Sequence, residues 1–141
     1  MNKKVYISVL GETVIDGEND STELVTEGEF AQRNGKYLLR YKEQLGLSED
    51  ACSTIIKIDT DTVVLTRTGM ANTQMIFECG KRHISHYETP MGSFTIGVST
   101  EKMDVKVDEN GGCVDIHYVL DINNSATVKN KLNLSIRGEQ S

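Results

Sequence analysis

Three side chains that can carry charge or form hydrogen bonds fall on the apolar face of two predicted strands. Tyr41 and Glu43 follow Tyr37 and Leu39 at every second position of one strand, and Arg67 follows Val63 and Leu65 in the same way on another. Successive side chains of a strand point to opposite faces, so the face that buries the apolar residues also turns these groups inward. A buried carboxylate or guanidinium is costly unless it is paired. We therefore expect Arg67 to meet an acidic or hydroxyl partner, with Glu43 and Tyr41 as the first candidates.

Two roles for Arg67 follow from this placement. In the first, it forms a structural ion pair in the core or props a loop. In the second, it anchors the carboxylate or phosphate group of a small ligand at an open end of the fold. The candidate ligand-binding residues are Tyr41, Glu43, Arg67 and Tyr87.

The other reactive side chains form no recognisable catalytic or metal-binding set. His83 and His86 are three residues apart, so on a strand they face opposite sides and are poorly placed to share a metal ion. Cys79 has the parity of Met75 and Phe77 and is expected in the core. Paired carboxylates lie in turns, and no glycine-rich phosphate loop occurs. The sequence predicts no catalytic residue, no metal site and no cofactor, and an enzyme is the least favoured class.

Composition indicates which elements position these residues. The 141 residues include 12 Val, 11 Ile and 13 Thr but only 4 Ala. Such β-branched side chains suit a pleated sheet and lose freedom in a helix, which argues against helical bundles and βαβ folds. The formal net charge of −6 removes the long-range attraction to nucleic acid or an anionic membrane. No apolar run is long enough to span a bilayer.

Alternation with period two recurs along the chain and is typical of antiparallel strands with one buried face. The clearest example lies between Val114 and Ile122, where apolar residues alternate with charged ones and a histidine. Turn signals such as Asn34-Gly35 separate these runs. The only candidate helical turn lies at 42–50. We predict strands near 3–15, 21–32, 36–43, 52–58, 62–68, 73–79, 82–89, 92–100, 103–108, 113–122 and 127–137.

The scarcity of proline carries topological information. The chain has one proline, Pro90, and it falls between two predicted strands. Proline lacks the N–H that a ladder needs and commonly blunts exposed sheet edges, so many strands without it favour a sheet that closes on itself. We predict a single domain over residues 1–141, an all-β, closed antiparallel up-and-down barrel of about 8–10 strands.

The cysteines and the start of the chain bear on location. Cys52, Cys79 and Cys113 are odd in number and far apart, which favours free thiols in a reducing cytoplasm over a disulfide framework. The short apolar stretch 5–10 follows two lysines and imitates a signal peptide, but polar residues interrupt it and no cleavage site follows. We interpret it as the first strand and expect a cytoplasmic protein.

Six segments in a fixed order carry a family resemblance. They are T-E-G-x-F at 26–30, a strand with two tyrosines and a glutamate at 36–43, a T-I-I-K-I strand at 54–58, V-x-x-x-R-x-G at 63–69, M-x-F-x-x-G at 75–80 and Y-x-T-P-x-G at 87–92. Together they resemble the YwiB-like family of uncharacterised bacterial proteins, a domain of unknown function, over nearly the whole chain. The resemblance implies a calycin-like, lipocalin-type barrel in the cytoplasm. It implies no activity and transfers no catalytic residues.

Two non-enzymatic functions compete. The leading hypothesis is a barrel that binds one small molecule at its mouth, where Met70 and Met91 would line the entrance. The alternative is a structural or interaction module without a ligand. It would form a homodimer through a barrel face on which Val64, Ile76 and Val119 point outward.

Overall fold

The regular structure of the described residues consists of strands. The computed structural model describes residues 3–15, 17–44, 51–69, 72–123 and 125–138, and its regular elements there are ten β-strands. They are β1 (Lys3–Ile15), β2 (Glu18–Arg33), β3 (Lys36–Gln44), β4 (Ala51–Ile58), β5 (Val63–Thr68), β6 (Thr73–Phe77), β7 (Arg82–Thr89), β8 (Gly92–Asp108), β9 (Gly111–Ile122) and β10 (Ser125–Gly138). Among the described residues, no helix is long and apolar enough to cross a membrane.

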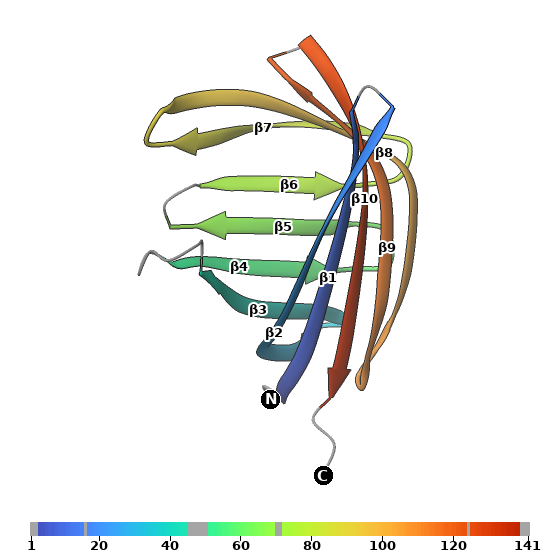
Figure 1. The fold of residues 1–141 in the computed structure, drawn as a ribbon. Coiled ribbons are helices and arrows are strands. Elements are labelled where there is room, and N and C mark those ends of the chain that lie inside the picture. Colours follow the sequence, from blue (N-terminus) through green and yellow to red (C-terminus); the bar gives the residue numbers. More distant parts are fainter. Residues whose placement is uncertain (1–2, 16, 45–50, 70–71, 124, 139–141) are drawn as a thin grey trace.

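The strands form an up-and-down barrel. The sheet order is β6-β5-β4-β3-β2-β1-β10-β9-β8-β7, all neighbours are antiparallel, and the first strand pairs with the last. In Figure 1, β3–β7 lie across the page, whereas β1, β9 and β10 run steeply past their ends. The ten strands thus make a nearly closed barrel, which confirms the predicted fold class.

Closure between β6 and β7 does not use a continuous backbone ladder. We call this contact the seam. At one end, Asn72 and Glu88 exchange backbone hydrogen bonds of 2.9 and 2.8 Å as an isolated bridge. In the middle, the Ser85 hydroxyl donates to the backbone carbonyl of Gln74. At the other end, the turn between the strands is tied to β8, because the Gly80 N–H donates to the carbonyl of Thr100 at 3.0 Å.

The core lies in the barrel interior and is formed by alternate residues of the strands, as one-sided burial requires. Phe30 and Tyr37 stack with ring centroids 5.5 Å apart, and Phe77 meets Tyr118 edge-on at 4.9 Å. The buried cluster consists of Val5, Ile7, Phe30, Leu39, Tyr41, Ile56, Ile58, Val63, Leu65, Phe77, Val98, Val114, Ile116, Leu134 and Ile136.

Two local features explain conspicuous glycines. The turn between β2 and β3 has Asn34 and Gly35 at φ 52° and 78°, the left-handed pair that a tight hairpin turn favours. Gly28, in the T-E-G-x-F motif, lies where β2 meets β3. A Cβ there would come within 2.5 Å of the Arg40 carbonyl oxygen and of the Ile7 side chain. Only glycine lets the two strands approach this closely.

Three sequence predictions differ from the structure. The predicted strands 92–100 and 103–108 are one strand, β8, with a register irregularity between Thr100 and Lys102. A β-bulge bends a strand without ending it, so the break in alternation was misinterpreted as a turn. The core placement of Cys79 was wrong, because β6 ends at Phe77 and Cys79 is exposed in the following turn. The helical turn at 42–50 overlaps β3 as far as Gln44, and its remainder lies outside the described residues.

Candidate functional site

A polar row crosses the inner face of four neighbouring strands. Tyr41 on β3 lies directly opposite Thr54 on β4, Thr54 lies opposite Arg67 on β5, and Arg67 lies opposite Thr73 on β6. Directly opposite residues have Cβ atoms about 4.5–5.5 Å apart, so these four side chains are consecutive neighbours. Tyr41 is 3% exposed and belongs to the core, which places the whole row on the interior face, as alternation predicted.

The two threonine hydroxyls of this row are buried without a described partner. Thr54 is 0% exposed and Thr73 is 7% exposed, and their Oγ1 atoms make no hydrogen bond among the described residues. Arg67 is half-buried, and its Nε is covered. Buried polar groups in native proteins are normally hydrogen-bonded, so such hydroxyls mark hydrogen-bonding capacity that the described residues leave unused.

A second polar pair lies on β8 and β9. Thr100 on β8 lies opposite Tyr118 on β9, and Thr100 is 3% exposed with its Oγ1 also lacking a described partner. Burial raises the pKa of the Tyr118 phenol, and the positive charge of Arg67 opposes that rise. Tyr118 and Arg67 are therefore within electrostatic reach of each other across the interior, although they lie on strands far apart in the sheet order.

At one end of the barrel, inward-facing apolar side chains are partly exposed. Tyr87 lies opposite Phe94, and Ile96 lies opposite Ile122, on the inward face that also holds Val98. Ile96 is 5% exposed, but Phe94 and Ile122 are 39% and 40% exposed despite facing inward. Apolar side chains on an inward row become exposed where the barrel ends, so these residues mark its mouth. Tyr87 is half-buried at this position.

The four predicted ligand-binding residues are placed as follows. Tyr41 and Arg67 lie on one interior row, and Tyr87 lies near the mouth, on β7. The backbone of Glu43 pairs with Cys52 at the end of β3, but its side chain lies outside the described part of the chain. The pairing of Arg67 with Glu43 therefore stays a prediction. The sequence analysis did not single out Thr54, Thr73, Thr100 or Tyr118, although the alternation of β9 had put Tyr118 on the buried face.

The histidines fall on opposite faces, as predicted. His83 is half-buried and His86 is exposed. His83 Nε2 lies 3.0 Å from one oxygen of Glu78, and Lys81 Nζ lies 3.3 Å from the other. The hydrogen bond to His83, followed by that to Lys81, lowers the pKa of the Glu78 carboxyl. Within the described ranges, no group of three or more acidic, histidine or cysteine side chains is arranged to hold a metal ion.

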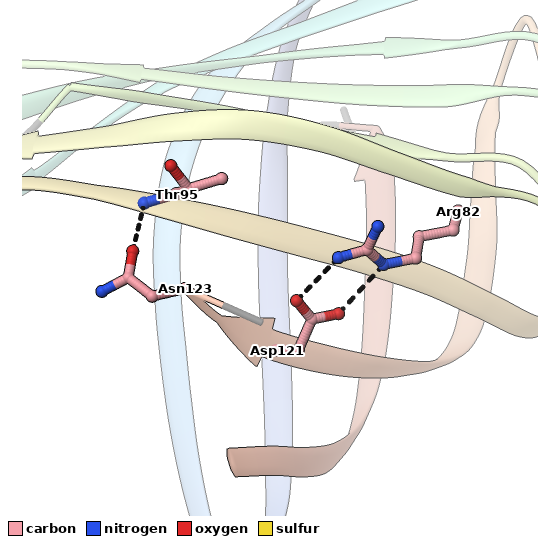
Figure 2. Close-up of polar contacts among 4 residues, drawn as sticks. All are labelled: Arg82, Thr95, Asp121 and Asn123. Atoms are coloured by element: carbon pink, nitrogen blue, oxygen red, sulfur yellow. Dashed lines mark hydrogen bonds and ion pairs between the residues drawn. The ribbon is translucent and has the colours of Figure 1, made fainter. Parts of the chain in front are cut away.

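Beside the mouth, a bidentate ion pair on the outer face of the barrel links β7 to β9. Figure 2 shows the guanidinium of Arg82 on the carboxylate of Asp121, with Nε–Oδ2 and Nη2–Oδ1 distances of 3.1 and 2.8 Å. The pair crosses Gly97 on β8, where a Cβ would collide with both groups. Next to it, the Thr95 N–H donates to Asn123 Oδ1 at 2.9 Å. These contacts fix the register of β7, β8 and β9, and hence the position of Phe94 and Ile122.

Grooves lined by described residues also lie outside the interior. One of about 540 Å³ opens where β3 diverges from β2, and Glu27, Tyr41 and Lys42 are among its walls. Another of about 470 Å³ lies on the outer face of β1, β9 and β10, between Tyr6, Val25 and Arg137. Neither groove brings Arg67 and Tyr118 together, so the interior rows are the better candidate site.

Comparisons with known proteins identify relatives but no activity. Over 140 residues, the chain is 24% identical to the uncharacterized β-barrel protein YwiB of Bacillus subtilis (strain 168), covering 98% of this chain and 97% of that protein. The crystal structure of the ywiB protein from Bacillus subtilis matches with a TM-score of 0.88 at 22% identity, covering 99% of this chain and 94% of that one. This likeness supports the barrel fold. The family described as Domain of unknown function (DUF1934) matches residues 7–134, and the chain therefore belongs to that family.

Proposed function

We propose that this protein binds a small molecule in the mouth of its barrel and the adjoining interior, with Arg67 as the anchor. The observation that carries the proposal is the place of Arg67 on the inward face, between the buried Thr54 and Thr73, in a barrel whose inward-facing Phe94 and Ile122 are partly exposed. Ligand sites are typically apolar hollows with a few convergent polar groups.

Each part of the site has a chemical task in this proposal. Phe94, Ile122 and Tyr87 offer apolar and aromatic surface to the body of the ligand. Arg67 offers a guanidinium, which remains charged at any physiological pH and can hold a carboxylate or phosphate through two parallel hydrogen bonds. Tyr41 lies in the same row and would pack beside the bound group. Glu43 remains a candidate on sequence grounds alone.

The alternative is a homodimer without a ligand. The residues named for it, Val64, Ile76 and Val119, are half-buried in the barrel wall. Two exposed apolar side chains of the outer face, Tyr6 and Val25, are 41% and 67% exposed and line one groove. A dimer would bury this face.

The proposed location is the cytoplasm. Cys79 and Cys113 are free thiols, which suits a reducing compartment.

Native mass spectrometry of protein purified from its own source tests the function. We expect an added mass that is released on denaturation, that is lost in Arg67→Met and that remains in the control Arg33→Met, because Arg33 is exposed at the end of β2. An added mass retained by Arg67→Met would remove Arg67 as the anchor. A dimer that carries no added mass would favour the alternative, and light scattering gives the same subunit count in solution.

A further inference from the structure

We propose that the ligand of this barrel carries an oxyanion, a carboxylate or a phosphate, and that the hydroxyls of Thr54, Thr73 and Thr100 hold it together with Arg67 and Tyr118. This inference rests on the proposed function and assigns its ligand a chemical class. It also assigns roles to three threonines that the sequence analysis did not single out.

Three buried threonine hydroxyls have hydrogen-bonding capacity that the described residues leave unused. The Oγ1 atoms of Thr54, Thr73 and Thr100 are buried, and none has a partner among the described residues. A buried hydroxyl without a partner destabilises a fold, whereas a valine of the same shape would fill the space without that penalty. Three such hydroxyls on the walls of one interior point to a bound group that completes them.

The three threonines lie beside Arg67 and Tyr118. Thr54 and Thr73 flank Arg67 as its direct cross-strand partners on the two sides. Thr100 is the direct partner of Tyr118, whose ring packs edge-on against Phe77 of β6, on the same face as Thr73, and the charge of Arg67 acts on the Tyr118 phenol. The five side chains therefore surround one region of the interior, between the sheet of β4–β6 and the strands β8 and β9.

The side chains around this region favour a negatively charged ligand group. Arg67 offers only donors and a positive charge. Burial raises the pKa of Tyr118, so its phenol stays protonated at neutral pH and can donate. Threonine hydroxyls rotate and donate to whichever acceptor is nearest. A set of donors around a cation suits a group that only accepts hydrogen bonds and carries negative charge.

Binding also requires a small rearrangement. The threonine oxygens are covered in the unliganded interior. Side chains around them therefore have to move as the oxyanion enters. Phe94 and Ile122 would then meet the apolar part of the ligand, which makes an amphipathic anion the expected chemistry.

Isothermal titration with four probes tests the chemical class. The probes are octanoate, octyl phosphate, inorganic phosphate and the uncharged 1-octanol. We expect an octyl anion to bind more tightly than 1-octanol, and inorganic phosphate to compete with it. Whether octanoate or octyl phosphate binds more tightly distinguishes a carboxylate ligand from a phosphate ligand. Equal affinity for 1-octanol and both anions would overturn the oxyanion inference while leaving a binding barrel. No binding of any probe at millimolar concentration would count against both proposals.

Valine substitutions test the threonines. In Thr54→Val, Thr73→Val and Thr100→Val, the anion should bind at least roughly tenfold more weakly, because each change removes a hydrogen bond to a charged group. Affinity for 1-octanol should stay unchanged, as should anion affinity in the control Thr127→Val, which alters an exposed residue of β10. The melting temperature of the unliganded variants should not fall, and this verifies folding. Unchanged anion affinity in all three variants, or ordered water alone on the three hydroxyls in a crystal grown with octyl phosphate, would overturn the proposal.

Discussion

At the scale of single residues, the best-defined polar contact is the ion pair of Arg82 and Asp121. The hydrogen bond from Arg82 lowers the pKa of the Asp121 carboxyl, although partial burial opposes the shift. A carboxyl whose pKa is lower in the folded state stabilises the fold above its unfolded pKa, which is about 3.9 for aspartate. That stabilisation is lost as the pH falls through the lower, folded value.

Asp121→Asn should therefore reduce the free energy of unfolding at pH 7 and have little further effect at a pH below the folded pKa. Urea unfolding at a series of pH values from 7 down to about 2 measures both differences. The control Asp20→Asn alters an exposed carboxyl on β2 and should change neither. If Asp121→Asn destabilised the protein equally at every pH, the effect would come from packing and not from the charge of this carboxylate.

Gly97→Ala should break the same pair without unfolding the barrel. The added methyl group would collide with the Arg82 guanidinium and the Asp121 carboxylate, and the arginine end is flexible enough to move away. We expect Gly97→Ala to lower the free energy of unfolding at pH 7 by about as much as Asp121→Asn does. The double variant should be no less stable than the less stable of the two single variants, because both changes remove the same ion pair. Additive losses in the urea experiment would show that Gly97 serves the backbone independently of the ion pair.

Residue-level prediction from sequence succeeded where alternation alone decides the face. It turned Tyr41 and Arg67 inward and separated His83 from His86. It failed for Cys79, because parity holds only while the strand continues. The pairing of Arg82 with Asp121 depends on the mutual register of three strands, and no short-range pattern encodes that register.

At the scale of elements, the seam distinguishes β6 and β7 from the rest of the barrel. The other neighbouring strands share antiparallel ladders, two of which contain a register irregularity, whereas β6 and β7 meet through the Asn72–Glu88 bridge and the Ser85 hydroxyl. Backbone amides that lack ladder partners open at lower free energy than those inside a ladder.

Hydrogen–deuterium exchange should therefore be faster in β6 and β7 than in β1 and β10. Ser85→Ala should accelerate exchange in β6 further, because it removes the hydroxyl that donates to Gln74. The control Ser8→Ala lies in the middle of β1, inside two ladders, and should leave β6 unaffected. Equal protection of β6 and β1 in the unmodified protein would show that the seam is as firmly closed as the ladders.

Most strand positions were predictable because turn residues and alternation agree at their ends. β1, β3, β5 and β7 match their predicted ranges to within one residue. The bulge in β8 was not predictable, since a shift of register and a short turn interrupt alternation in the same way. The incomplete pairing of β6 with β7 was not predictable either. The scarcity of proline favours a closed sheet, but it does not indicate how the two edge strands are joined.

At the scale of the whole molecule, the barrel closes by bringing the two ends of the sequence together. β1 and β10 pair over ten consecutive positions, from Val5 with Gly138 to Val14 with Lys129. Contacts between the ends of a chain form late and slowly, because a long loop must first be closed. β10 is therefore the strand on which the cooperative unit depends, with β1 on one side and β9 on the other.

Leu134→Ala tests this dependence in the middle of β10. Leu134 is 2% exposed and lies opposite Val9 and Val114, so truncation leaves a cavity in the shared core. We expect the free energy of unfolding to fall by about 2–5 kcal/mol. The control Lys131→Ala alters an exposed residue of the same strand and should stay within about 0.5 kcal/mol. Circular dichroism and the fluorescence of the five tyrosines should report one coincident urea transition for both variants. If the tyrosine signal of Leu134→Ala changed before the circular dichroism, the barrel would unfold in parts, and β10 would not hold it together as one unit.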